Sequence, residues 1–157
     1  MPQGIVNPSN VVLCAGVPII TECEVKTATQ MYPGLVVVRD TSDGNIKIGT
    51  TAVADPLGVL DLKPEGLRST IYTQYDQARV LSGPCDVLIN ACSGATITAG
   101  ITLVTGSGGT CAQGTTAGAI IGRAVTSPGT CTAVVGGDGN TPSHWYSDKW
   151  VRVRLQI

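Results

Sequence analysis

The side chains best suited to catalysis are few and widely separated. The chain of 157 residues has a single histidine, His144, in a loop-like stretch between Thr141 and Tyr146. A serine or threonine nucleophile needs a base within reach. A single histidine in a loop gives little indication of such a nucleophile–base pair.

The glycine clusters at 106–109 and 136–139 neither open a predicted helix nor carry the lysine of a phosphate-binding loop. We interpret them as hairpin turns.

Aspartates near the ends of predicted strands are the other source of acid–base chemistry. They are Asp40, Asp43, Asp55, Asp61, Asp76 and Asp86. The segment Gly58-Val59-Leu60-Asp61 is similar to the Gly-Val-Ile-Asp motif of trimeric dUTPases, small all-β enzymes in which the aspartate orients the attacking water. No Arg-Ser-Gly-type phosphate motif precedes it, and no glycine-rich tail with an aromatic follows. A dUTPase-like nucleotide hydrolase is therefore a remote alternative, and we expect no catalytic residues and no enzymatic activity.

The cysteines do not show the spacing of a metal site. They are Cys14, Cys23, Cys85, Cys92, Cys111 and Cys131. No two lie in a Cys-x-x-Cys arrangement, whereas a structural zinc site uses closely paired ligands. We expect no metal and no cofactor. Small buried thiols are favoured over three disulfides, and both readings stay open.

The composition excludes several classes of partner. Charged residues make up 13% of the chain, with Lys+Arg 10 against Asp+Glu 11, and aromatic residues make up 4%. Nucleic-acid binding relies on clustered basic residues and aromatic stacking, so we expect no nucleic-acid partner. No run reaches the roughly 18 apolar residues of a membrane helix, and the first residues lack a secretory signal. We expect no membrane partner. The 43% hydrophobic content argues against disorder.

Short β-branched and apolar runs bounded by turn residues cover most of the chain. The predicted strands are 11–13, 19–26, 35–40, 45–50, 57–61, 78–81, 86–90, 101–104, 119–125, 132–135 and 151–157. Glycine-rich turns between such runs are hairpin signals. Helical periodicity is nearly absent, and 65–77 is the best candidate for one short helix. The fold class is therefore all-β, a compact barrel or sandwich.

The last predicted strand alternates strictly. Val151, Val153 and Leu155 share one face, while Arg152 and Arg154 share the other. The arginine pair is either a solvated outer face or an interface for an acidic partner, because arginine is enriched at interfaces. Nearby, Trp145 and Tyr146 are further interface candidates.

The first residues differ from the rest. Residues 1–10 carry two prolines and no charged side chain. They are either a frayed terminus or an arm that orders against a partner by adding a strand to a sheet edge. We divide the chain into an extended arm with the first strands, 1–24, and a β-rich domain, 25–157.

The order of segments resembles the head decoration (cement) proteins of tailed double-stranded DNA phages and related viruses. The resemblance starts in the segment that ends with Tyr32-Pro33-Gly34-Leu35-Val36, like the "-yPG-lV-" entry turn of that family. It continues through Asp43-Gly44, 56–60, 75–81, 97–104, 119–125 and 151–155. Two features depart from the family pattern, namely Ile101, where an acidic residue is usual, and the extra loop 136–149.

This resemblance implies a structural virion protein on the outer capsid surface, made in the host cytoplasm. It implies a compact, commonly trimeric body that binds the major capsid protein at threefold or quasi-threefold positions, cements neighbouring capsomers and has no activity of its own. It also implies an N-terminal arm that clamps capsid subunits. The expected capsid contacts are Pro2, Gly4, Ile5, Val6, Pro8, Val11, Val12 and Leu13.

A binding module is the rival hypothesis. Trp145, Tyr146 and Trp150 cluster near the end of the chain, where an aromatic platform for a glycan could form. The protein would then be a host-surface or glycan-binding knob on a phage head or fibre. The competing interpretation places Trp150 in the core and Trp145 at a subunit contact, because a glycan platform also needs polar groups nearby.

Overall fold

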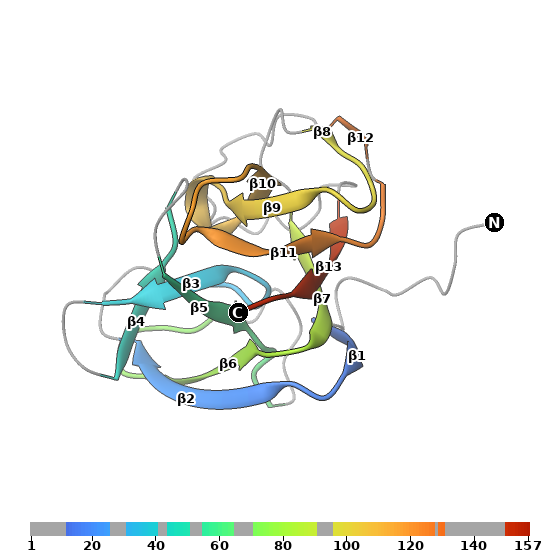
Figure 1. The fold of residues 1–157 in the computed structure, drawn as a ribbon. Coiled ribbons are helices and arrows are strands. Elements are labelled where there is room, and N and C mark those ends of the chain that lie inside the picture. The colour runs from blue at the N-terminus through green and yellow to red at the C-terminus, as the bar shows by residue number, and fades with distance from the viewer. Residues whose placement is uncertain are drawn as a thin grey trace.

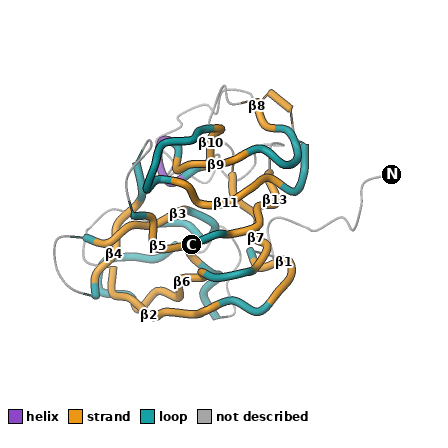
Figure 2. Tube along the Cα trace, viewed as in Figure 1, coloured by secondary structure: helices purple, strands orange, loops and turns teal. Residues whose placement is uncertain are grey.

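The computed structural model describes residues 12–25, 31–40, 44–50, 55–64, 71–90, 96–127, 129–130 and 150–157. In this part of the chain the regular elements are strands and one 3₁₀ turn, and none is a helix that could cross a membrane. In chain order they are β1 (Leu13–Gly16), β2 (Ile19–Val25), β3 (Val36–Arg39), β4 (Asn45–Ile48), β5 (Pro56–Leu60), β6 (Gln77–Ser82), β7 (Cys85–Asn90), β8 (Thr96–Ile97), β9 (Thr102–Thr105), η1 (Ser107–Gly109), β10 (Cys111–Gln113), β11 (Ile120–Ala124), β12 (Gly129–Thr130) and β13 (Trp150–Leu155). The all-β prediction is confirmed (Figures 1 and 2).

The first half of the chain forms a small closed barrel with strand order β2-β4-β3-β5-β6. Its neighbours are antiparallel except β2 and β4, which run parallel and pair only at Glu24 with Asn45 and at Val25 with Ile46. This short pairing closes the barrel. In Figure 1 β2 runs along the lower edge of the molecule, beneath β6.

The second half of the chain, together with β1, forms an antiparallel sheet with strand order β1-β7-β13-β11-β9-β10. Strand β13 lies in its centre, pairing with β7 on one side and with β11 on the other. The strict alternation predicted for this strand is confirmed, because Val151, Val153 and Leu155 are buried. Strands β8 and β12 form a separate pair.

One core joins the barrel to the sheet. Val36, Val59 and Leu81 of the barrel belong to the same buried cluster as Val87 and Val153 of the sheet. A second cluster fills the barrel itself. Its largest fully buried members include Tyr72, Met31 and Leu35. Apolar packing therefore holds the barrel and the sheet together. This packing is possible because strands in both direct alternate side chains inward and outward.

Every predicted strand in the described residues overlaps an observed one, and 132–135 lies outside them. The strands β8, β10 and β12 were not predicted, because each is only two or three residues long. Of the candidate helix, residues 71–77 instead hold a β-bridge between Tyr72 and Met31, a turn and the start of β6. The turn Ser82-Gly83-Pro84 is not a hairpin; it carries the chain from the barrel (β6) to the sheet (β7).

The first described residues belong to the folded body. Strand β1 pairs with β7 in the sheet, and β2 pairs with β6 in the barrel. The proposed division at residue 24 stays a prediction, because residues 1–11 lie outside the described part.

Candidate functional site

The two predicted interface arginines lie on either side of a buried carboxylate. Arg154 is opposite Asp86 in the ladder between β13 and β7. Its Nε donates to Asp86 Oδ1 at 3.0 Å, and Arg152 Nε donates to Asp86 Oδ2 at 3.0 Å. The Asp86 side chain is only 4% exposed, against 34% for Arg152 and 67% for Arg154. The arginines thus have an acidic partner inside their own chain.

This geometry keeps Asp86 ionised. Burial acts to raise the pKa of its carboxyl group, but the hydrogen bonds and charges of Arg154 and Arg152 outweigh burial and hold the pKa below its usual range. A carboxylate that accepts from two guanidinium groups is a strong charge-assisted pair. The cluster therefore orients both arginines and leaves a net positive charge on the outer face of the sheet.

A third arginine extends this surface. Arg123 of β11 is the direct neighbour of Arg154 in the next ladder, and its Nη1 lies 3.4 Å from the Gly100 carbonyl oxygen. Arg123 was not among the predicted interface residues. The feature of the sequence that could have indicated Arg123 is its position as the single charged residue inside the apolar run 119–125.

The described part of the predicted capsid-contacting segment belongs to the core. Val12 is 1% exposed, and its carbonyl oxygen accepts a hydrogen bond from the Leu88 N–H at 2.9 Å. Leu13 is partly buried against the same cluster. The other predicted capsid contacts lie outside the described residues; they are Pro2, Gly4, Ile5, Val6, Pro8 and Val11. Trp145, Tyr146 and His144 lie outside the described residues as well. These contacts remain predictions.

Asp61, the residue of the dUTPase-like motif, contacts the backbone of the next residue and a side chain of β6. Its Oδ1 accepts from the Leu62 N–H at 2.8 Å, and its Oδ2 lies 3.6 Å from Arg79 Nη1. The Tyr72 hydroxyl donates to the Asp61 carbonyl oxygen at 2.7 Å. Burial, reinforced by the Asp61 charge, raises the pKa of Tyr72 to about 12. This arrangement fits a structural role for Asp61.

The remaining acidic and thiol groups are dispersed. Asp76 pairs with Lys63 at 2.7 Å, and Asp40 lies 3.9 Å from Lys47. Burial raises the pKa of the Cys23 and Cys85 thiols. Within the described ranges, no group of three or more His, Cys, Asp or Glu side chains could hold a metal ion. Cys92 and Cys131 lie outside those ranges.

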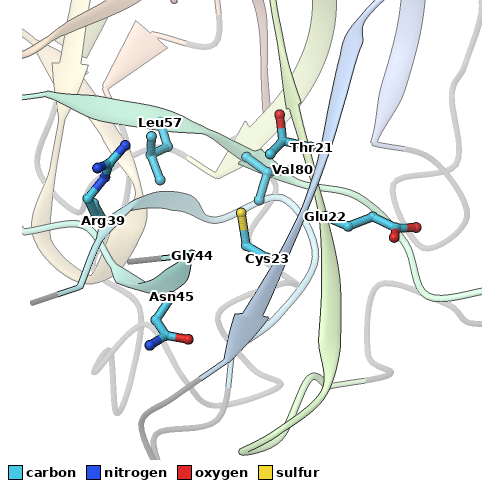
Figure 3. Close-up of a pocket in the computed structure, with 8 residues that line it drawn as sticks. All are labelled: Thr21, Glu22, Cys23, Arg39, Gly44, Asn45, Leu57 and Val80. Carbon is cyan, nitrogen blue, oxygen red and sulfur yellow. The ribbon is translucent and has the colours of Figure 1, made fainter. Parts of the chain in front are cut away.

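A hollow of about 180 Å³ lies at one end of the barrel. Figure 3 shows Leu57 and Arg39 on one side of it, and Thr21, Cys23 and Val80 on the other. Gly44, Asn45 and Glu22 complete its lining, and the Glu22 side chain points away from the other lining residues. The hollow adjoins the part of β2 that β4 does not cover.

Apolar side chains are exposed along this same segment. Val17 is 84% exposed, Ile19 61% and Ile20 46%. Three exposed branched aliphatic residues within four positions make this segment a candidate interaction surface. The residue pattern of 19–26 predicted a strand and gave no sign of an interaction surface.

Comparison with known proteins gives a fold relationship. No protein-family model and no curated protein matches the chain. Among solved structures it is similar to the N base of the head fiber gp8.5 in bacteriophage phi29, with a TM-score of 0.51 and 13% sequence identity. The match covers 88% of this chain and 95% of that one. At this identity the likeness shows that the two chains share a fold.

Proposed function

We propose that this protein is a structural component of a phage head. It sits on the outer surface of an icosahedral capsid, contacts the major capsid protein and cements neighbouring capsomers. The proposed form is a homotrimer that has no enzymatic activity, needs no cofactor and is made in the host cytoplasm. It contacts neither nucleic acid nor membrane.

The observation that carries this proposal is the shared fold. The similar structure is the base of a head fiber, and the likeness extends over nearly the whole of both chains. The segment order that resembles decoration proteins, described above, points to the same class of protein.

The surface of the molecule suits such a role. Only 13% of its residues are charged. A closed cyclic oligomer covers part of such a surface. Many identical weak contacts engaged together would then hold the shell through avidity, without one tight binding site.

The test is co-sedimentation with undecorated capsids of the encoding virus. The full-length protein is expected to bind at saturable positions. A variant without residues 1–11 is expected to remain folded and to lose capsid binding. The deletion ends at residue 11 because Val12 is a core residue. Unimpaired binding by this variant would contradict the role of the arm, and absence of binding by the full-length chain would contradict the proposal.

Light scattering after size exclusion tests the oligomer separately. A mass of three chains of 16.1 kDa is expected. A single-chain mass at micromolar concentration would contradict the homotrimer while leaving capsid attachment to be judged by co-sedimentation.

A further inference from the structure

Strand β2 has an open edge. In the ladder with β6, alternate residues of an antiparallel pair direct their backbone groups to opposite sides. The Val25 N–H bonds to Asp76 next to β6, whereas the Glu24 N–H bonds to Gly44 next to β4. Ile20 and Glu22 therefore direct their N–H and C=O groups away from β6. Strand β4 begins to pair only at Glu24, so in the described part of the chain these groups meet no partner strand.

The open edge is apolar and adjoins the hollow. Val17, Ile19 and Ile20 are exposed beside it. Thr21 and Cys23, on the opposite face of β2 from Glu22, point into the hollow together with Val80 and Leu57 (Figure 3). A cavity of about 150 Å³ accommodates a benzene-sized group. The hollow of about 180 Å³ is thus large enough for one aliphatic side chain of a strand laid along β2.

The other face of the edge carries Ile20, Glu22 and Glu24. Arg79 lies opposite Glu22 in the ladder with β6, and its Nη1 lies 3.6 Å from Asp61 Oδ2. The carboxylates of Glu22 and Glu24 make no ion pair or hydrogen bond in the described residues. Both side chains lie on the face of β2 opposite Cys23, since they alternate with it along the strand. A strand that is added here and carries basic residues on this face would place them next to the two carboxylates.

We propose that the β2 edge binds an extended polypeptide segment of another protein by strand addition. The segment alternates apolar residues, one of which fills the hollow, with basic residues that face Glu22 and Glu24. Backbone hydrogen bonds to Ile20 and Glu22 hold it, which is the general mode of β-augmentation. A second copy of β2 is a poorer occupant, because antiparallel pairing of two β2 strands brings the glutamates of both chains to one edge, where like charges repel.

The test uses a capped synthetic peptide of alternating valine and lysine, flanked by threonine, titrated into the full-length protein by calorimetry. Saturable binding of one peptide per chain is expected. The same peptide with its interior amides N-methylated should bind about tenfold more weakly or not at all, because it cannot donate to the edge. Replacement of its lysines by glutamates should abolish binding.

Protein variants locate the peptide. Thr21→Trp, at an exposed position, fills the mouth of the hollow and should weaken binding about tenfold. Glu22→Gln should weaken binding about threefold through loss of one charge pair. Asp55→Asn removes the same charge from an exposed residue outside the lining of the hollow and should leave binding unchanged. Unchanged urea midpoints for all three variants would show that folding is not the cause.

Three results would overturn the inference. The first two are equal binding of the N-methylated peptide and equal binding of the glutamate peptide. The third is self-association of the protein that Ile20→Lys abolishes while Tyr75→Lys, at an exposed position outside β2, does not. Self-association through Ile20 would bear on the homotrimer. None of the three outcomes bears on co-sedimentation with capsids, so the strand-addition site and capsid attachment can fail independently.

Discussion

Asp86 organises the outer face of the six-stranded sheet. Its carboxylate is buried, and both oxygens are occupied by Arg152 and Arg154. Removing one member of such a group leaves the others with an unpaired charge or an unsatisfied donor. The resulting loss in the free energy of unfolding exceeds the net contribution of the intact interaction. The arginines are partly exposed, so water offsets some of this cost.

We expect Asp86→Asn to lower the free energy of unfolding by about 2 kcal/mol, in the range for hydrogen bonds to charged groups. Urea titration at pH 7 measures it. Asp55→Asn, which changes an exposed aspartate by the same chemistry, should stay within about 0.5 kcal/mol of the parent. Equal midpoints for Asp86→Asn and the parent would show that the cluster adds nothing to stability.

The difference between parent and Asp86→Asn should depend on pH. The pKa of Asp86 is lowered from its ordinary value of 3.8 in the folded state. Its stabilisation is therefore fully present above about pH 3.8 and is lost as the pH falls through the lower folded-state value. Urea midpoints at pH 7, 5, 4 and 2.5 should show a constant gap between pH 7 and 5 that narrows at the lowest pH. A gap that widens with acid would contradict this assignment.

At the scale of elements, β11 and β13 approach so closely that only glycine fits at residue 122. A Cβ at this position would collide with the Arg154 carbonyl oxygen, a backbone atom that cannot turn aside. Gly122 sits opposite Leu155 in the ladder, one residue from the Arg123–Arg154 pair. The glycine therefore sets the spacing of the strands that carry all three arginines.

Gly122→Ala is expected to lower the free energy of unfolding by about 3 kcal/mol, the upper part of the usual cost of overpacking. Thermal denaturation measures the loss. Gly44→Asn is the control, since its Cβ would meet open space and asparagine tolerates a φ of 75°. A loss equal to or smaller than that of the control would mean that β13 moves aside without cost.

At the scale of the whole molecule, barrel and sheet share a core and should unfold together. Val59 of the barrel packs in the same cluster as Val153 of the sheet. Small domains with one contiguous core usually unfold in a single cooperative step. Circular dichroism and tryptophan fluorescence should therefore give coincident urea transitions. Val59→Ala should shift both equally, and separate transitions would show that the barrel and the sheet are independent.

The amino-acid sequence by itself determined the class of fold and most strand positions. Period-two alternation, as in Val151, Arg152 and Val153, is a local property that follows from the pleat of a strand. Turn residues such as Gly44 are equally local, because a positive φ is readily adopted by glycine. Short strands such as β10 were not predicted, because two or three residues are too few to show an alternation of apolar and polar side chains.

Only the tertiary structure decided which strands are neighbours, and with them the candidate sites. Asp86 and Arg154 are 68 residues apart in the chain, and no local pattern pairs them. The path of the chain after Ser82, which leaves the barrel instead of turning back, depends on where β6 and β7 find partners. The open edge of β2 arises in the same way, since β4 meets that strand only at its end. Strand pairing depends on contacts between distant residues, so it becomes visible only when the whole chain is folded.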